Sequence, residues 1–318
     1  MKGKKTISIV TPIYNEEKNL LELSKRLTEV FENNKDYLFE VILVENGSHD
    51  ESYSICKEIS QKDDRFKMLK LSRNFGCDGA ITAGLKFAKG DAAVIMASDL
   101  QDPPELINQF IKKWEEGFEN IYQIVSKRTG IGFIRKVNSQ LFYYIVNLMT
   151  GGVMPKNVSD FRLIDKKVYK AINNMQERNR FIRGLFAWSG FKSIGVPYKR
   201  PERFAGESKA STLTVLSLAL KGIFAYSYIP LQIITWTGIL FSVFSFGFLG
   251  ITSYRAIFYG VPFSGYGTIM GVMLLMFGFI FIFLGIIGKY IGLIYEEVKQ
   301  RPNFIISESL GIKEDESD

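Results

Sequence analysis

The feature that most constrains the fold of this chain is a pair of long uncharged segments near its carboxyl end. No Asp, Glu, Lys or Arg occurs in residues 222–254 or in residues 256–288. Each segment exceeds the ~20 apolar residues that a helix needs to cross a bilayer core, whereas an apolar run of ~10–14 is more typical of a buried helix in a soluble protein. The sequence therefore predicts two membrane spans, near residues 231–253 and 268–287.

Basic residues are distributed unevenly around these two segments. Cations lie before the first segment and after the second, whereas the loop between them, at residues 255–266, carries only Arg255. By the positive-inside rule, this pattern places both termini in the cytoplasm and the loop outside. The net charge is +7. A basic surface at the inner leaflet would suit anionic lipid or a nucleotide phosphate, although ordinary solubilising charge explains it equally well. The flanking cations are Lys209, Lys221, Lys289, Lys299 and Arg301.

The rare residue types exclude several classes of protein. His49 is the single histidine, so the chain has no HExxH zinc site and no multi-histidine metal centre, and it shows no obvious Ser-His-Asp triad. Cys56 and Cys77 form no CxxC pair and no disulfide scaffold, and we interpret them as reduced cytoplasmic thiols. Catalysis would have to depend on carboxylates, lysines, arginines and a bound metal ion. We expect His49 to be a turn residue.

Up to residue 125, short β-rich runs alternate with helical patterns, which predicts a doubly wound parallel sheet. Ligands of such sheets bind beyond the carboxyl ends of the strands. The turn after the first strand, at residues 11–16, has no glycine, so a Rossmann dinucleotide site is not expected, and a Walker loop is absent as well. We expect strands at residues 7–11, 39–44, 68–71, 92–97 and 121–125. We expect helices at residues 15–31 with Asn15 as N-cap, from about residue 50, at residues 78–88 and at residues 103–116.

The regular alternation ends after Ser126. There we expect helices at residues 133–149, 166–175 and 180–189, strands at residues 160–164 and 193–198, and a surface helix at residues 213–221. The predicted organisation is a cytoplasmic domain at residues 1–205, a linker and interfacial amphipathic helix at 206–228, two transmembrane helices at 229–290, and an acidic, loosely ordered cytoplasmic tail at 291–318.

The segment ASDLQDPPE, at residues 97–105, is the most informative motif. Asp99 and Asp102 flank Gln101 at the end of the predicted fourth strand. Oxygen ligands of this kind hold Mg²⁺ or Mn²⁺, often together with a diphosphate. Asp102 would equally well cap the helix that begins at Pro103, whereas for Asp99 the metal interpretation is favoured.

Several segments together resemble a known enzyme family. TPIYNEEKNL, VENGSHD, LSRNFG, SDLQDPPE, SDFRLID, ERFAGESK and IGKYIGLIYEEVKQRP occur in family order over nearly all of residues 6–302. On these motifs the chain resembles family 2 glycosyltransferases of the polyprenyl-phosphate type, such as bactoprenol glucosyltransferases and dolichol-phosphate mannose synthase. The resemblance implies a GT-A nucleotide-sugar domain followed by two membrane spans, and sugar transfer to an isoprenoid phosphate in the membrane.

The resemblance also implies a donor site. Pro12, Tyr14 and Glu16 correspond to the wall of the nucleoside pocket. Glu45 and Asn46 stand where the family contacts the base, usually with an acid at the second position, so Asn46 could instead pair with a uracil edge. The remaining implied donor contacts are Arg73, Ser98 and the basic loop of Arg203, Ser208 and Lys209, whose cations could also serve the membrane surface.

The family's metal motif, Asp-x-Asp, reads Ala97-Ser98-Asp99 here, so its first carboxylate is missing. Asp99 and Gln101, with Asp102, remain the expected ligands of Mg²⁺ or Mn²⁺. Asp160 matches the catalytic aspartate and has Arg162 beside it. The second pKa of an acceptor phosphate is ~6, so we expect Asp160 mainly to orient substrates. Proton abstraction by Asp160, or an ion pair with Arg162 or Lys166, is an alternative. The expected partners of the acceptor phosphate are Lys127, Arg128 and Arg135.

The implied reaction is an inverting transfer from UDP-glucose or a UDP-N-acetylhexosamine to undecaprenyl phosphate at the inner membrane of a bacterium. A flippase and a polymer-modifying glycosyltransferase would act downstream, the chain could form homo-oligomers, and no nucleic acid is expected as a partner. A processive polysaccharide synthase would need a QxxRW motif, which residues 176–181 do not match, and more spans. A non-catalytic scaffold or flippase partner is the other alternative, suggested by Ala97 and Asn46.

Overall fold

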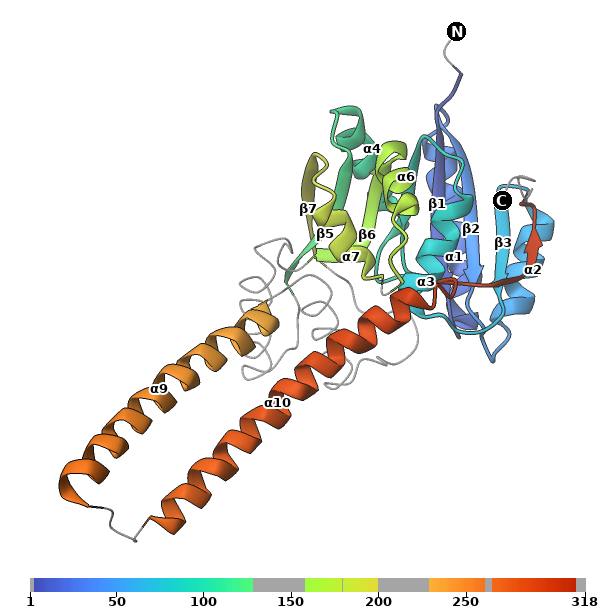
Figure 1. Cartoon of the computed structure of the whole chain (residues 1–318). Helices are drawn as coiled ribbons and strands as arrows, with labels where there is room; N and C mark the ends of the chain where they lie inside the picture. Colours follow the sequence, from blue (N-terminus) through green and yellow to red (C-terminus); the bar gives the residue numbers. More distant parts are fainter. Residues whose placement is uncertain (1–2, 128–157, 179, 200–228, 261–264, 313–318) are drawn as a thin grey trace. The chain divides into compact units, whose positions relative to one another are not determined.

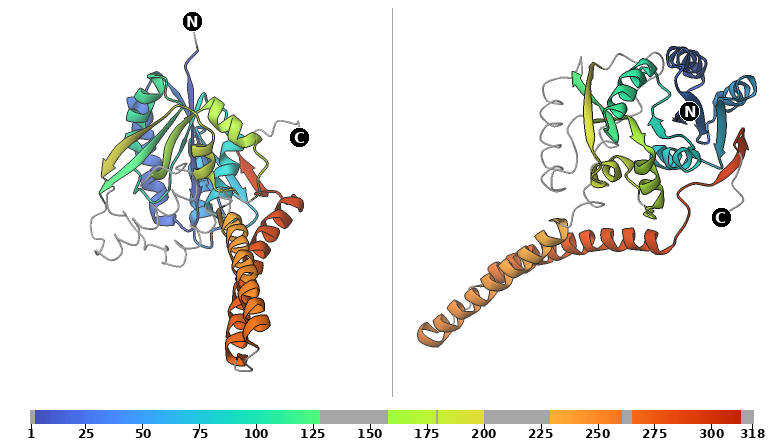
Figure 2. Two further views of the ribbon diagram at one scale, coloured as in Figure 1. Left: turned by 60° about the vertical axis from the view of Figure 1, so that its left-hand side comes forward. Right: turned by 90° about the horizontal axis from the view of Figure 1, so that it is seen from above.

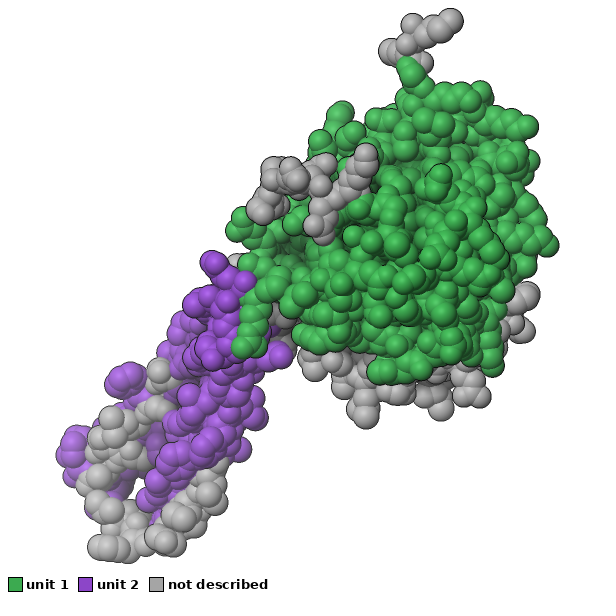
Figure 3. All heavy atoms as spheres, turned by 90° about the vertical axis from the view of Figure 1, so that its right-hand side faces the viewer, with its two compact units in different colours: residues 1–219, 301–318 green, residues 220–300 purple. Residues whose placement is uncertain are grey.

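The computed structural model describes residues 3–127, 158–178, 180–199, 229–260 and 265–312. The chain forms two compact units, one of residues 1–219 with 301–318 and the other of residues 220–300, which are coloured separately in Figure 3. The predicted helices at residues 133–149 and 213–221, and the predicted linker at 206–228, lie outside the described residues.

The first unit is built on a mixed sheet, which has eight strands in the described part of the chain, in the order β7-β5-β6-β4-β1-β2-β3-β8 (Figure 1). The five strands predicted up to residue 125 are present and run parallel, whereas β6 and β8 are antiparallel to their neighbours. The strands are β1 (Thr6–Ile13), β2 (Leu38–Glu45), β3 (Phe66–Leu71), β4 (Ala92–Ile95), β5 (Asn120–Lys127), β6 (Val158–Asp165), β7 (Ser193–Lys199) and β8 (Ile306–Leu310).

Helices cover both faces of this sheet (Figure 2). An amphipathic helix buries one stripe of apolar side chains, and α1 does so with Leu20, Leu23 and Leu27. One face carries α1 (Glu17–Asn33), α2 (Ser52–Lys62), the short 3₁₀ turn η1 (Pro104–Leu106) and α4 (Ile107–Glu115). The opposite face carries α3 (Gly76–Phe87), α6 (Lys166–Asn174) and α7 (Ile182–Trp188).

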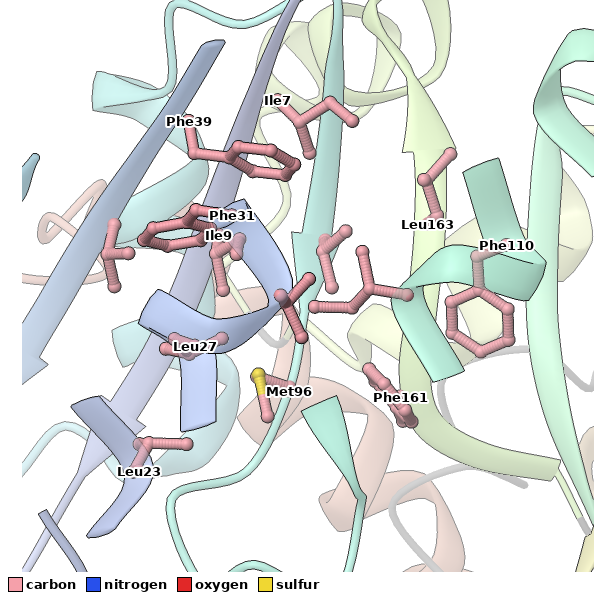
Figure 4. Close-up of a cluster of buried hydrophobic side chains, with 14 of the residues drawn as sticks. Ile7, Ile9, Leu23, Leu27, Phe31, Phe39, Met96, Phe110, Phe161 and Leu163 are labelled. Atoms are coloured by element: carbon pink, nitrogen blue, oxygen red, sulfur yellow. The ribbon is translucent and has the colours of Figure 1, made fainter. Parts of the chain in front are cut away.

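The core between the sheet and the face covered by α1, α2 and α4 is apolar and aromatic (Figure 4). The rings of Phe31 and Phe39 stack with centroids 4.6 Å apart, and Phe110 packs on Phe161 at 4.8 Å. Burial of a side chain of this size contributes about 1.5–3 kcal/mol. The core therefore holds the strand ends, and the loops that follow them, in a defined arrangement.

Residues 306–310 form β8, which corrects the prediction of a loose acidic tail for this part of residues 291–318, while residues 313–318 lie outside the described residues. β8 pairs antiparallel with β3, and the Ser72 amide donates to the Ile305 carbonyl at 2.9 Å. Glu308 accepts from the Tyr53 hydroxyl at 2.7 Å and pairs with Lys57 at 3.1 Å. The physical reason is that β3 would otherwise expose unpaired backbone groups at the sheet edge.

The second unit consists, in its described residues, of α9 (Ile229–Tyr259) and α10 (Tyr266–Val298). The rings of Phe241 and Phe279 pack between the two helices with centroids 5.0 Å apart. Most of the other large apolar side chains point outward. By length and composition, the described part of the chain has two stretches able to cross a membrane, Ile229–Phe248 and Leu275–Val298. The predicted spans lie within these two helices.

Candidate active site

Three parallel strands end at the same edge of the sheet and bring the predicted donor residues together. Ile13 at the end of β1 pairs with Glu45 at the end of β2, and Val10 pairs with Ile95 at the end of β4. The loop after β4 then crosses the end of β1, because the Ser98 hydroxyl donates to the Pro12 carbonyl at 3.1 Å. The motifs TPIYNE, VENGSHD and ASDLQD therefore share one edge.

Hydrogen bonds between loops organise the turn after β1. Asn15 has a positive φ of 54° and its side-chain oxygen accepts from the His49 amide at 2.8 Å. The N-cap position of α1 is Glu16, so the prediction of Asn15 as N-cap was wrong. The amides at the start of α1 are instead satisfied from the start of α2 and the loop before it: the Glu16 amide donates to the Ser52 hydroxyl (2.9 Å) and the Glu17 amide to the Asp50 carboxylate (3.3 Å). Tertiary contacts thus replace a local cap.

The predicted wall of the nucleoside pocket lies beside this turn. Pro12, Tyr14 and Glu16 are all half-buried. The ring of Tyr14 meets the imidazole of His49 edge-on, with centroids 6.3 Å apart, which agrees with the expected turn position of His49. Glu16 accepts from the Asn19 side-chain amide at 2.6 Å. An aromatic ring and a carboxylate at a loop edge can contact a nucleoside, and their role here stays a prediction.

Glu45 and Asn46 are buried and hold neighbouring turns. The Glu45 carboxylate accepts from the Ser48 amide at 2.5 Å. The Asn46 amide group donates to the Asn74 side-chain oxygen (3.2 Å) and to the Gly76 carbonyl (3.1 Å), and its oxygen accepts from the Phe75 amide (2.9 Å). Asn46 therefore fixes the turn at residues 74–76, a role that its sequence context did not predict.

Arg73 projects from that turn into solvent. Its guanidinium lies 4.2 Å from the centre of the Phe75 ring and donates to the Asn74 carbonyl at 3.2 Å. Gly47 has a φ of +73°, and a Cβ there would lie 2.8 Å from the Arg73 carbonyl carbon and from the Asn74 nitrogen. Glycine is therefore required where the loop after β2 crosses the loop after β3. Arg73 is placed at the same edge as the other predicted donor residues.

The segment after β4 carries backbone strain next to its carboxylates. Leu100 is buried and has a φ of 57°, a conformation that is unusual for a residue with a branched side chain. Asp99 and Asp102 are buried on either side of it, and the Gln101 amide donates to Asp99 at 3.2 Å. The Ser159 hydroxyl lies 3.5 Å from the Asp102 carboxylate. This contact joins the segment to β6 beside Asp160.

The alternative that Asp102 is the N-cap of the following helix is wrong, because the N-cap position of η1 is Pro103. Within the described residues, no group of three or more His, Cys, Asp or Glu side chains forms a metal site. The donor set of Asp99, Gln101 and Asp102 consists of hard oxygen ligands and fits Mg²⁺ or Mn²⁺ if a diphosphate completes the coordination. Asp99 and Asp102 are both buried, and their binding of a metal ion stays a prediction.

Asp160 does not pair with Arg162 or Lys166, as one interpretation of the sequence suggested. Its carboxylate accepts two hydrogen bonds from the guanidinium of Arg183 on α7, at 2.8 and 2.6 Å. Lys166 instead lies 3.9 Å from Asp91. Arg183 was missed by sequence reasoning, because a single arginine in a helical segment carries no motif.

Arg162 is buried beneath this pair. Its guanidinium donates to the carbonyls of Ser159 (3.3 Å) and Asp160 (3.4 Å), and it lies 4.4 Å from the centre of the Phe186 ring. Burial lowers the pKa of Arg162 to about 10, against the opposing charge of Asp160. The side chain therefore remains a cation at neutral pH in an apolar setting.

Six of the predicted substrate contacts lie partly or wholly outside the described part of the chain. Arg128, Arg135, Arg203, Ser208 and Lys209 lie outside the described residues. Lys127 ends β5, which runs parallel to β4, so its backbone reaches the same edge of the sheet, while its side chain is not described.

Comparison with known proteins gives a consistent result. The model of glycosyl transferase family 2 matches residues 8–172. An uncharacterized glycosyltransferase of Bacillus subtilis, YkcC, is 42% identical over 306 residues, which cover 96% of this chain and 94% of that protein. The SfII prophage-derived bactoprenol glucosyl transferase of Shigella flexneri is 35% identical over 303 residues, with 95% and 98% covered.

A solved structure shares the fold. Glucosyl-3-phosphoglycerate synthase from Mycobacterium tuberculosis, in complex with Mn²⁺, uridine diphosphate and phosphoglyceric acid, superposes with a TM-score of 0.50. The sequences are 14% identical, and the match covers 70% of this chain and 78% of that one. The predicted GT-A type of sheet is thereby confirmed.

Proposed function

The chain belongs to glycosyl transferase family 2, and we propose that it is an inverting enzyme that transfers a hexose or aminohexose from a nucleotide diphosphate donor to undecaprenyl phosphate. One observation supports this most directly. The contact between Ser159 and Asp102 joins the buried carboxylates after β4 to Asp160, at the edge where the donor loops end. Full-length relatives named bactoprenol glucosyl transferase support the lipid acceptor.

The proposed donor is UDP-linked glucose or N-acetylhexosamine. A divalent cation, Mg²⁺ or Mn²⁺, would supply positive charge to the leaving diphosphate. Asp99 and Gln101, with Asp102, would hold it, and the complex of a same-fold synthase with Mn²⁺ and uridine diphosphate supports such a pairing. Tyr14 and Arg73 would contact the nucleoside and its phosphates, and the basic residues around Lys209 would close over the donor.

In the proposed reaction, an oxygen of the acceptor phosphate attacks the anomeric carbon on the face opposite the leaving group. The bond from that carbon to the diphosphate breaks, and its electron pair leaves with the nucleotide. Because the second pKa of a phosphate monoester is ~6, no proton has to be removed from the nucleophile. Asp160, held by Arg183, would orient the reacting groups, and Arg162 would add positive charge beneath them.

The two helices α9 and α10 would anchor the protein in the bacterial cytoplasmic membrane, with the sheet domain and both termini in the cytoplasm. Residues 206–228 would form the interfacial segment. In this arrangement the sheet domain meets the lipid phosphate at the inner leaflet, and the lipid-linked monosaccharide would then pass to a flippase and a polymer-modifying enzyme. The apolar length of α9 and α10 and the cations that flank them support this topology.

The test uses the purified full chain in lipid nanodiscs with undecaprenyl phosphate, Mg²⁺ or Mn²⁺, and a panel of radiolabelled UDP-sugars. We expect a product with one sugar on the lipid, loss of transfer with EDTA, and a loss of at least about a hundredfold in kcat for Asp99→Asn. Products with several sugars would favour a processive synthase. A lack of turnover with every donor, or full activity of Asp99→Asn, would refute the proposal.

A further inference from the structure

The guanidinium of Arg183 binds the Asp160 carboxylate through two hydrogen bonds, an arrangement in which it could also bind a phosphate. Both of its hydrogen bonds are short, with Nε to Oδ1 at 2.8 Å and Nη2 to Oδ2 at 2.6 Å. The planar fork of a guanidinium binds carboxylate and phosphate oxygens in the same two-pronged manner. An arriving phosphate can therefore replace Asp160 on Arg183 without a change in the guanidinium's mode of binding.

The charge of the cluster formed by Asp160, Arg162 and Arg183 favours a further anion. Arg162 is 2% exposed, and among the described residues it donates to backbone carbonyls, lies on the face of Phe186 and forms no ion pair, although the charge of Asp160 acts on it. Counted over these three side chains alone, the cluster has two cations and one carboxylate. A buried cation close to the pair favours the binding of an anion there, because screening by water is weak.

The pair of Asp160 and Arg183 can also be reached from solvent. The Asp160 side chain is 46% exposed and that of Arg183 is 25% exposed. Asp160 follows Ser159, whose hydroxyl contacts Asp102, so the pair lies next to the proposed donor site. A ligand that enters there would meet the exposed pair before it meets the buried Arg162.

We propose that Arg183 exchanges partners during catalysis: the acceptor phosphate takes the guanidinium from Asp160 and thereby breaks this ion pair, so that the carboxylate can face the sugar. The inference rests on the proposed function, because it assumes a lipid phosphate acceptor. The dianion outcompetes a carboxylate with a single charge, and Arg162 supplies additional attraction. No covalent bond changes in this step. Arg183 is thus an acceptor-binding residue, and the free enzyme keeps Asp160 engaged until the acceptor arrives.

Arg183→Gln tests the binding half of this proposal in the full chain in nanodiscs. We expect the KM for undecaprenyl phosphate to rise about tenfold to a hundredfold, as for the loss of a hydrogen bond to a charged group, with the donor KM unchanged. The acceptor KM of Arg183→Lys should lie between those of Arg183→Gln and the wild type. The matched control is Arg65→Gln, which removes another two-pronged pair, with Asp63 at 2.6 Å, and should change neither KM.

Asp160→Asn tests the exchange itself. Since the carboxylate competes with the phosphate for Arg183, its removal should lower the acceptor KM about two- to fivefold while kcat falls, given that an exposed ion pair is worth about 0.2–1 kcal/mol. A purely structural pair predicts the opposite, a rise in KM together with a lower unfolding temperature. A rise in the acceptor KM of Asp160→Asn would therefore overturn the exchange.

Failure of the inference and failure of the proposed function give different results. Binding of undecaprenyl phosphate without donor is measured by the thermal shift of the wild type and of Arg183→Gln. If the wild type binds the lipid through Arg183 yet transfers no sugar, the proposed function fails and the inference about binding stands. If Arg183→Gln transfers sugar with the wild-type acceptor KM, the inference fails and the function stands.

Discussion

Replacement of Asn46 by alanine would remove three hydrogen bonds that hold the turn at residues 74–76. Asn46 is 3% exposed, and its amide donates to Asn74 and Gly76 and accepts from Phe75, over distances of 2.9 to 3.2 Å. The structure therefore predicts a loss of stability and a displaced Arg73 loop. Contact with a base predicts a change in nucleotide preference instead, so the variant separates the two roles.

The expected loss of stability can be worked out from the three hydrogen bonds of Asn46. A neutral hydrogen bond contributes about 0.5–1.5 kcal/mol, and a buried group left without a partner costs about 1–3 kcal/mol. Gly76 is exposed, so water can replace one of the bonds, whereas the Phe75 amide is less accessible. We expect Asn46→Ala to lower the free energy of unfolding by about 2–3 kcal/mol. For a domain of this size, that corresponds to a fall of about 4–12 °C in the unfolding temperature.

The assay combines thermal unfolding with donor kinetics for UDP- and GDP-sugars. The matched control is Asn173→Ala, which removes one hydrogen bond, to the Leu85 carbonyl; the side-chain oxygen of Asn173 has no hydrogen-bond partner among the described residues. It should lower the unfolding temperature by about 1–6 °C, about half the effect of Asn46→Ala. For Asn46→Ala we expect the donor KM to rise for all bases alike. An unchanged unfolding temperature combined with a new base preference would refute the reasoning.

Three further predictions concern the sheet and its loops. Burial would raise the pKa of Glu40, but hydrogen bonds from Lys67 and Ser8 outweigh it and lower that pKa. The ionised carboxylate therefore stabilises the fold at neutral pH, and this stabilisation is lost as the pH falls through the pKa of Glu40 in the folded state. Glu40→Gln should lower the free energy of unfolding by about 2 kcal/mol at pH 7 and by less at pH 4, as measured by thermal unfolding. An equal loss of stability at both pH values would contradict this. Leu100→Gly should be more stable than Leu100→Ala by about 1 kcal/mol, the reverse of the usual order, because glycine tolerates the positive φ; the opposite order in denaturant midpoints would show that the conformation is not strained. Deletion of residues 305–318 should expose the edge of β3 and cause aggregation, visible by size-exclusion chromatography as loss of the monodisperse peak, and an unchanged peak would contradict a protective role for β8.

The part of the fold that could be predicted from sequence is the part governed by local patterns. The five parallel strands and the helices between them follow from alternating apolar runs and turns, and that topology alone placed TPIYNE, VENGSHD and ASDLQD at one edge. Asp160 was reached only through resemblance to a family. Its position beside Asp102 depends on β6 being antiparallel, which no local pattern specified.

Features that depend on distant contacts could not be predicted. β8 is short, contains two serines, and pairs with a strand that lies far away in the sequence. Asn15 has the residue type of an N-cap, yet contacts from Ser48 and His49 hold it in a left-handed conformation. Arg183 became a candidate only when folding placed it against Asp160.

β8 also changes how this protein can be divided. The segment that contains β8 belongs to the first unit, although the 220–300 unit precedes it in the chain, so the helical pair is an insertion within the sheet domain and not a tail attached to it. A soluble fragment made by stopping before residue 220 would lack a strand of its own sheet. The fragment that keeps the sheet complete joins residue 219 to residue 301 through a flexible linker, and it is the form suited to crystallisation with a donor analogue.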